Sequence, residues 1–287
     1  MYKRQDHNLG IRHSQLNSSL TGYGDLRRYN TIILPSGSPD LSNYAKDILM
    51  DWVQQGGTLI ANNRSTRSII SNDIGSVKNL NNTFDKSKNF NFDLMREIYS
   101  MEEFIDISDA NVNKVSTVIT YPWETTDMTY SEEELEMRDK WQSTLMPSGG
   151  IVSARTDNEH WLTFGAEDIV PVLYGNYPIL MTGGNSEAAL RIGELLPNKE
   201  SETKTINWSQ IPSGYDLSVR MSGLVWPEAS QRIANSAYLT REKIGKGQII
   251  LFSGEPNFRG SALGTNRLWL NAVVYGSGLG TNSLVTP

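Results

Sequence analysis

Ionic and amide side chains gather in one short stretch of the chain, Ser253–Gly260, which has the sequence SGEPNFRG. It directly follows the apolar run Gln248–Phe252, which predicts a buried strand. Open α/β sheets place their ligand sites at the carboxyl ends of such strands. Glu255, Asn257 and Arg259 are therefore candidate ligand-binding residues. They also allow a structural alternative, in which Glu255 pairs with Arg259 in a buried clasp that anchors the last helix and costs about 3–5 kcal/mol to break from one side.

The sequence offers little for a nucleophile or a metal. It has no Cys, which excludes disulfides, thiolate ligands and a cysteine nucleophile. None of the three histidines belongs to a His-x-x-Glu motif, so no zinc site within the chain is predicted. Glu159 could orient the imidazole of His160, although a lone histidine is more often structural. A stand-alone hydrolase would need Ser36 or Ser253 as nucleophile with His160 as base. Nothing in the spacing of these residues supports such a pair beyond their presence in one chain. No catalytic residue is therefore assigned.

Acidic and Gly-rich stretches do not indicate a bound ion or cofactor. The acidic residues 132–136 lack the alternating oxygen donors and the Gly of a calcium loop, which favours a solvated helix face. Residues 276–280 (GSGLG) follow a predicted helix, so no helix N-terminus can receive a phosphate there. Residues 183–186 (GGNS) lie between a predicted strand and a predicted helix, where helix entry and capping explain them. No cofactor is predicted for this chain.

The clearest elements lie in the first quarter of the chain. Residues 29–34 (YNTIIL) form a β-branched apolar run, which predicts a strand buried on both faces. A helix follows, because apolar residues from Leu41 to Val53 recur on one helical face, with Ser38 or Asp40 as candidate caps. Residues 58–61 (TLIA) predict the next strand. Together they predict a βαβ unit of a doubly wound α/β sheet.

Outside residues 29–61, the predicted strands and helices follow one another less regularly. Leu9–Leu16 has room for one more strand, and the strand and helix that normally open such a sheet are missing, so we expect a truncated N-terminus. A strand is predicted at 179–182, with a short helical pattern from Ala188 to Leu195 after it. The strand 248–252 then leads to a largely buried helix at 266–275.

These elements divide the chain into three predicted segments. They are a first part of the α/β domain (1–75), a polar, Asn-rich and partly irregular insertion (76–149), and the remainder of the domain with the last strand and helix (150–287).

Composition limits the partners. Lys and Arg total 26 against 32 Asp and Glu, a net charge of −6, and no stretch concentrates basic residues, so no nucleic-acid partner is predicted. No apolar run approaches the roughly 18 residues that a membrane span requires. A globular protein with a sizeable core is expected.

One set of motifs resembles a known fold. YNTIILPSG, then WVQQGG and TLIA, look like the class I glutamine amidotransferase-like fold, a flavodoxin-like, mostly parallel α/β sheet. In active members a Cys occupies the tight turn after a central strand, and Phe-His-Pro-Glu follows a later strand. Here the turn reads Asn62-Asn63-Arg64 and the later motif reads Phe252-Ser253-Gly254-Glu255, so only the Glu remains. Amidotransferase chemistry is therefore excluded, while Asn63 and Arg64 join the candidate ligand-binding residues.

A second resemblance is more specific. GKGQIILFSGEPNFRG, GTNRLWLNA and the segment EHWLTFG resemble the C-terminal amidotransferase-like region of bacterial M14-type zinc carboxypeptidases, over about residues 25–280. The resemblance implies a secreted or periplasmic parent whose zinc-holding peptidase domain lies upstream. None of that domain is present here, so no zinc ligand is carried over.

Two functions of different classes remain open. In the first, the chain is a non-catalytic module that packs against the upstream peptidase domain. In the second, the 253–260 loop and Asn62–Arg64 form a pocket for a small ligand, such as a peptide carboxylate or a sugar.

Overall fold

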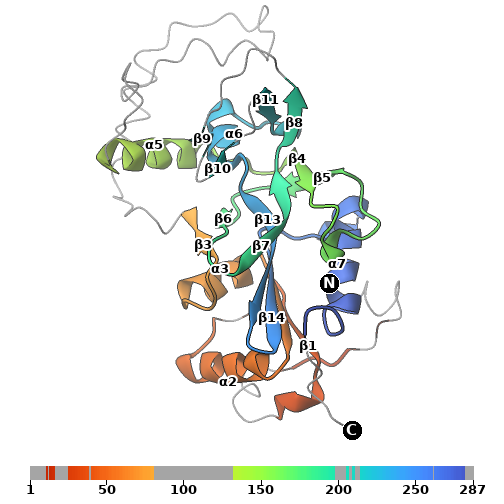
Figure 1. Ribbon diagram of the computed structural model, residues 1–287. Helices are drawn as coiled ribbons and strands as arrows, with labels where there is room; N and C mark the ends of the chain where they lie inside the picture. Colours follow the sequence, from red (N-terminus) through yellow and green to blue (C-terminus); the bar gives the residue numbers. More distant parts are fainter. Residues whose placement is uncertain are drawn as a thin grey trace, which may run out of the picture.

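The computed structural model describes residues 11, 13–16, 25–38, 40–80, 132–197, 205–206, 209–210, 214–260 and 262–281. In chain order the elements are η2 (Leu26–Arg28), β1 (Thr31–Leu34), α2 (Asn43–Gln54), β2 (Thr58–Asn62), α3 (Arg64–Ser71), β3 (Lys78–Asn79), α5 (Glu132–Thr144), β4 (Gly150–Thr156), η6 (Trp161–Thr163), β5 (Ile169–Tyr174), β6 (Leu180–Met181), β7 (Ser186–Ile192), β8 (Glu194–Pro197), β9 (Thr205–Ile206), β10 (Ser209–Gln210), β11 (Tyr215–Ser218), β12 (Arg220–Ser222), α6 (Pro227–Ile233), β13 (Ala237–Ile244), β14 (Gly247–Phe252), η7 (Phe258–Gly260) and α7 (Leu263–Tyr275). Figure 1 shows α2 at one end of the molecule and α5 and α6 toward the other.

The predicted βαβ unit is confirmed. β1 and β2 pair in parallel, with α2 as the crossover between them, and β14 pairs in parallel with the other side of β2. The cap of α2 differs from the expected ones: Ser42, not Ser38 or Asp40, accepts a hydrogen bond from the N–H of Ala45 at 3.2 Å. The strand and the helix predicted at the C-terminal end are β14 and α7.

The predicted α/β class is confirmed, with a sheet in the order β1-β2-β14-β13-β7-β4-β12. Fewer strands pair in parallel than expected: among the described strands, only β1, β2 and β14 do so. β13, β7, β4, β5 and β12 pair antiparallel with their neighbours. The reason is local, since Gly245 and Lys246 connect β13 to β14 as a hairpin, and a tight hairpin joins antiparallel strands.

The helical pattern predicted after residue 182 is wrong. Residues 186–192 form strand β7, and residues 183–186 form the turn that enters it, with the Ser186 N–H donating to Gly183 O at 3.2 Å. β7 lies between β13 and β4, so both of its edges pair with neighbouring strands. Ala188 packs in one core cluster while Ala189 and Ile192 pack in the other, and this two-sided burial hides the alternation of a strand.

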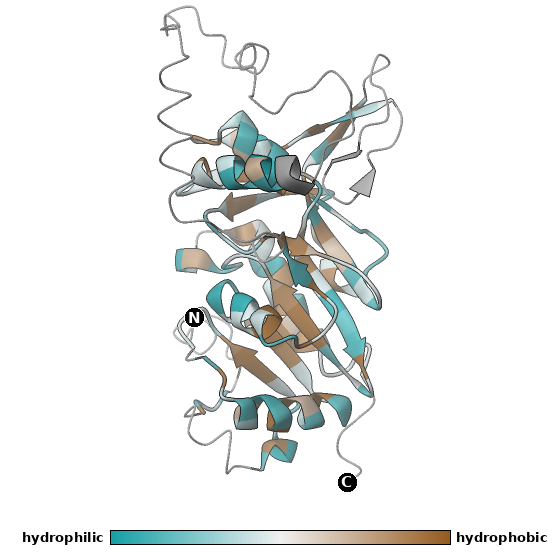
Figure 2. Ribbon diagram, turned by 90° about the vertical axis from the view of Figure 1, so that its left-hand side faces the viewer, coloured by the Kyte–Doolittle hydropathy of each residue, from teal (hydrophilic) through white to brown (hydrophobic). Residues whose placement is uncertain are grey.

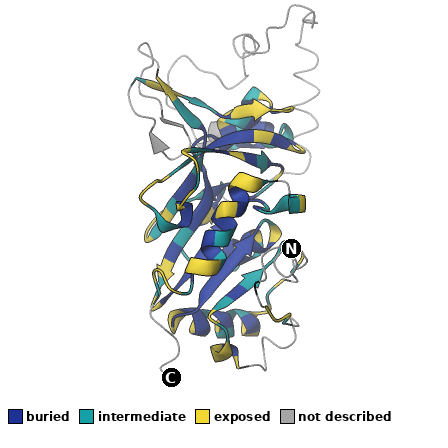
Figure 3. Cartoon of the chain, turned by 90° about the vertical axis from the view of Figure 1, so that its right-hand side faces the viewer, coloured by how far each residue is buried: buried dark blue, intermediate teal, exposed yellow. Residues whose placement is uncertain are grey.

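Two hydrophobic cores lie on opposite faces of the parallel strands. α2 and α3 pack against Leu59, Ala61 and Leu251 on one face, and α7 packs against Ile60 and Ile250 on the other. Figure 2 shows apolar residues along the central strands, and Figure 3 shows the same strands buried, with exposed residues on the outer sides of the helices. The helices cover the faces of β2 and β14, and loops follow the carboxyl ends of both strands.

Two predictions lie partly outside the described residues. Within Leu9–Leu16, the described residues Ile11 and His13–Leu16 are not in a strand. In the predicted insertion, β3 and α5 are regular elements, and 81–131 lies outside the description. Strands from both sides of the insertion join one sheet. No helix of the described residues is long and apolar enough to cross a membrane.

Candidate functional site

A sharp turn joins β2 to α3 at Asn63. Its backbone has φ 47° and ψ −110°, a combination outside the regions that L-residues ordinarily populate. The Asn63 N–H donates to Phe252 O at 3.1 Å, and Asn63 O accepts from Arg67 N at 3.0 Å. These bonds tie the strained residue to the end of β14 and to the first turn of α3. We refer to the turn Asn62–Arg64 as the elbow.

Hydroxyl groups fix the start of α3 against the strand ends. Thr66 Oγ1 donates to Phe252 O at 2.7 Å, and Ser65 Oγ donates to Pro35 O at 2.6 Å. Both residues are buried. The helix start is therefore bound to the carboxyl ends of β14 and β1, which holds the elbow rigidly.

The elbow meets the loop that follows β14. Asn63 Nδ2 donates to Glu255 Oε1 at 3.4 Å, and both side chains are half-buried. The loop is held on either side of Glu255, because Ser253 Oγ donates to Pro178 O at 2.7 Å and Thr265 Oγ1 donates to Pro256 O at 2.5 Å. The structure thus brings together two of the five predicted site residues.

Tyrosines surround the base of this loop. A Cβ placed on Gly254 would lie 2.8 Å from the ring of Tyr177 and 3.1 Å from the ring of Tyr238, so both rings press directly on the backbone beside Glu255. Burial raises the pKa of Tyr177, and the charge of Glu255 raises it further. Burial also raises the pKa of Tyr238, with smaller contributions from Tyr177 and other neighbours including Glu255. Both hydroxyls therefore stay protonated at neutral pH.

A third tyrosine extends the cluster inward. The ring of Tyr174 lies 5.5 Å from that of Tyr177, and burial raises the pKa of Tyr174 to about 12. Sequence reasoning missed all three tyrosines, because they come from β5, from the segment before β6 and from β13. Only the fold places them beside the loop after β14.

Asn62, which precedes the elbow, is fully buried at the end of β2. Within the described part of the chain, neither Oδ1 nor Nδ2 of its side chain has a hydrogen-bond partner. Its register partner in β14 is Phe252, whose ring lies 5.5 Å from that of Trp269 on α7. A buried amide of this kind costs about 1–3 kcal/mol when it is left unpaired.

The predicted clasp between Glu255 and Arg259 is wrong. No ion pair among the described residues joins them, and the exposed Arg259 lies over the ring of Phe258 at 5.1 Å. The spacing of four residues would align the two side chains on a helix. Here the chain turns, with Arg259 itself at φ 49°.

The other two candidates stay predictions. Arg64 is exposed at the start of α3, and Asn257 is half-buried in the loop, where its carbonyl accepts from Gly260 N at 3.1 Å.

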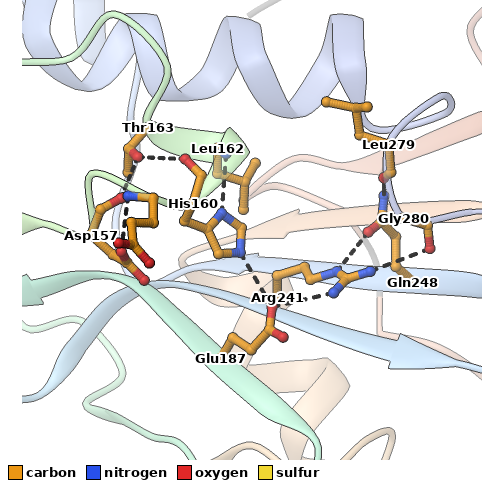
Figure 4. Close-up of polar contacts among 10 residues, drawn as sticks. Asp157, His160, Leu162, Thr163, Glu187, Arg241, Gln248, Leu279 and Gly280 are labelled. Atoms are coloured by element: carbon orange, nitrogen blue, oxygen red, sulfur yellow. Dashed lines mark hydrogen bonds and ion pairs between the residues drawn. The ribbon is translucent and has the colours of Figure 1, made fainter.

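His160 belongs to a different network, drawn in Figure 4. Its Nδ1 accepts from the Leu162 N–H at 3.1 Å, so the ring proton is on Nε2, which faces Glu187 Oε2 at 3.3 Å. Arg241 Nη1 also donates to Glu187, at 3.2 Å. Glu187, and not the adjacent Glu159, therefore orients the imidazole.

The same network secures the end of α7. Arg241 Nε donates to Gln248 Oε1 at 2.9 Å, and Gln248 Nε2 donates to Leu279 O at 3.0 Å (Figure 4). Gln248 Nε2 also donates to Gly276 O, at 2.6 Å. Neither Ser36 nor Ser253 has a hydrogen bond to His160 in the described residues, and Ser253 already donates to Pro178 O. The arrangement is structural and does not form a serine–histidine pair. The described residues contain no group of three or more metal-ligating side chains.

Comparisons with known proteins give only distant likenesses. No family model matches the chain, and no curated protein matches it. A ThuA-like protein from Bacteroides uniformis is 12% identical with a TM-score of 0.42, over 95% of this chain and 79% of that one. A cytoplasmic protein from Salmonella typhimurium is 11% identical with a TM-score of 0.40, over 93% of this chain and 82% of that one. Neither likeness identifies a function, and the resemblance to zinc carboxypeptidases stays a prediction.

Proposed function

We propose that the chain binds a small, uncharged, hydroxyl-bearing molecule, such as a sugar, at the elbow between β2 and α3. In this proposal, Asn63 and Glu255 form hydrogen bonds to the ligand, and Tyr177 lies beside them. The proposal develops the ligand-binding alternative that the sequence left open. It assigns no bond-breaking step to these residues.

The backbone strain at Asn63 is the observation that carries the proposal. A non-glycine residue in such a conformation costs roughly 1–3 kcal/mol, and such residues cluster at ligand clamps and active sites. The elbow also lies at the carboxyl ends of parallel strands, where open α/β sheets bind their ligands. Hydrogen bonds from both β14 and α3 maintain the strained turn.

The polar groups at the elbow suit a hydroxyl. The contact between Asn63 Nδ2 and Glu255 Oε1 is long, at 3.4 Å, and is therefore weak enough for a ligand to replace. A sugar hydroxyl both donates and accepts, so it can donate to the carboxylate and accept from the amide. The ring of Tyr177 adds an apolar surface with a polar tip.

Charge argues against a carboxylate ligand. Glu255 is the ionisable group in direct contact with Asn63, and it would repel an anion. The nearby arginines Arg64 and Arg259 are exposed, where water and salt screen their charges. A neutral ligand avoids this repulsion.

Saturation-transfer NMR and calorimetry with glucose, galactose and sucrose test the proposal. We expect one of these probes to bind the natural protein, and Glu255→Gln to weaken its binding roughly tenfold, because a hydrogen bond to a charged group contributes on that order. Glu167→Gln is the matched control, since Glu167 is an exposed carboxylate on another loop.

Equal binding by the Glu255→Gln and Glu167→Gln variants would refute the assignment. So would binding of acetate in preference to every sugar of the panel.

A further inference from the structure

Two arginines lie side by side on neighbouring strands of the sheet. Arg155 on β4 and Arg191 on β7 are direct partners in an antiparallel pair. Side chains at directly opposite positions lie on the same face, with Cβ atoms roughly 5 Å apart. β4 and β7 are neighbours in the middle of the molecule (Figure 1), and β13 and β14 separate β7 from β2.

This pairing of like charges is energetically unfavourable by itself. Both arginines are half-buried, so water screens their repulsion less than it would on an open surface. Burial lowers the pKa of Arg155 to about 10, and the neighbouring Arg191 contributes to that shift. Burial also lowers the pKa of Arg191. Directly opposed like charges destabilise a sheet unless something offsets them.

No acidic side chain does so in the described structure. None of the ion pairs between described residues includes Arg155 or Arg191. The acceptors of both guanidiniums are neutral: Arg155 donates to Gly193 O at 3.0 Å and to Asn235 Oδ1, and Arg191 donates to Asn235 O at 3.1 Å and to Thr182 Oγ1 at 3.1 Å. The pair therefore keeps its full double positive charge.

The guanidiniums are also held in place and keep spare donors. Each has five N–H groups, and each uses two of its nitrogens in these bonds. Asn235 binds both arginines from a turn fixed by two backbone bonds, Asn235 N to Ile192 O at 2.9 Å and Ile192 N to Ser236 O at 2.8 Å. Asn235 is itself buried and has φ 59°. Such anchoring pre-organises the pair for a ligand.

We propose that Arg155 and Arg191 together bind a phosphate-type dianion, either free phosphate or the phosphate group of a phosphomonoester. Two guanidiniums match the two negative charges of that group, and their planar forks suit its oxygens. A monovalent carboxylate would leave one half-buried positive charge uncompensated. This site does not depend on the function proposed for the elbow.

Titration calorimetry with inorganic phosphate at constant ionic strength, with chloride as the counter-anion, tests this site. We expect the natural protein to bind phosphate more tightly than acetate, and both Arg155→Gln and Arg191→Gln to weaken phosphate binding roughly tenfold or more. The control is Arg67→Gln, which removes an equal charge from an exposed position on α3 and should bind phosphate like the natural protein.

Phenyl phosphate, a phosphomonoester without the sugar hydroxyls that the elbow would bind, distinguishes the two sources. It should bind more tightly than inorganic phosphate if the site takes a phosphomonoester, and more weakly if it takes the free ion. If a glutamine variant fails to fold, as judged by circular dichroism, Arg191→Lys replaces it, and its loss of the planar fork should still weaken binding. Absence of phosphate binding by the natural protein would overturn the proposal, as would equal losses in the Arg67→Gln control.

Discussion

Two substitutions at Asn63 separate the cost of its backbone strain from the contribution of its side-chain hydrogen bond. Asn63→Ala and Asn63→Gly both remove the bond to Glu255 Oε1, but only glycine adopts φ 47°, ψ −110° without strain. We therefore expect Asn63→Gly to be more stable than Asn63→Ala by about 1–2 kcal/mol, within the range for such strain. Urea denaturation of the two variants measures the difference. Equal stabilities would mean that the elbow relaxes without cost.

His160 makes the stability depend on pH. Burial is the main cause that lowers the pKa of His160 below its ordinary value of 6.5, although Glu187 partly opposes it. As pH falls through 6.5, the unfolded chain therefore gains a proton at His160 before the folded chain does, so the free energy of unfolding decreases. The stabilisation is present at pH 7 and is lost progressively below pH 6.5.

A variant isolates this effect. His160→Asn keeps an acceptor for the Leu162 N–H at the start of η6 but does not titrate. Denaturation at pH 7.5 and pH 5.5 should show a smaller loss of stability for this variant than for the natural protein. An equal loss in both would assign the pH dependence to other groups.

Between helices, a buried ion pair joins α5 to α6. Arg232 donates to Asp139 through Nε at 2.8 Å and Nη2 at 3.2 Å, and both side chains are almost fully buried. Asp139→Asn leaves the buried guanidinium without its paired charge, and we expect a loss of about 3 kcal/mol in the free energy of unfolding.

A second ion pair on α5 gives the matched control. Glu136 pairs with Lys140 one turn away and is more exposed, so Glu136→Gln should cost only about 0.5 kcal/mol. Thermal denaturation compares the two variants. Similar losses for both would contradict the role given to Asp139.

The sequence predicts elements well where one pattern dominates. The βαβ unit and α7 follow from long apolar periodicities, and the loop after β14 follows from its position behind a buried strand. β7 could not be predicted, because its alanines face two cores and imitate a helical spacing. Parallel pairing was overestimated because the hairpin at Gly245 and Lys246 reverses the chain before the last strand.

The candidate sites show the same limit. Asn63 and Glu255 could be placed together from the sequence, because both follow strands of the parallel part of the sheet. The meeting of Arg155 with Arg191 depends on the cross-strand register, which no local pattern encodes. The assumed pairing of Glu255 with Arg259 failed because four-residue spacing has no fixed meaning in a loop.

For the whole molecule, the mixed sheet separates two kinds of position. The parallel strands β1, β2 and β14 end at the strained elbow, and the antiparallel strands β7 and β4 carry the arginine pair. One sheet thus presents an acidic, hydroxyl-rich corner and a basic pair. We expect ligands of the two sites to bind independently, because no described contact links Glu255 to Arg155 or Arg191.

Sugar binding at the elbow can be tested with a crystal structure of the natural protein soaked with the best-binding sugar. We expect Asn63 at positive φ, with ligand hydroxyls within about 3.2 Å of Asn63 Nδ2 and a Glu255 carboxylate oxygen. Asn63 in an ordinary helical or extended conformation, or a sugar bound away from the elbow, would contradict it.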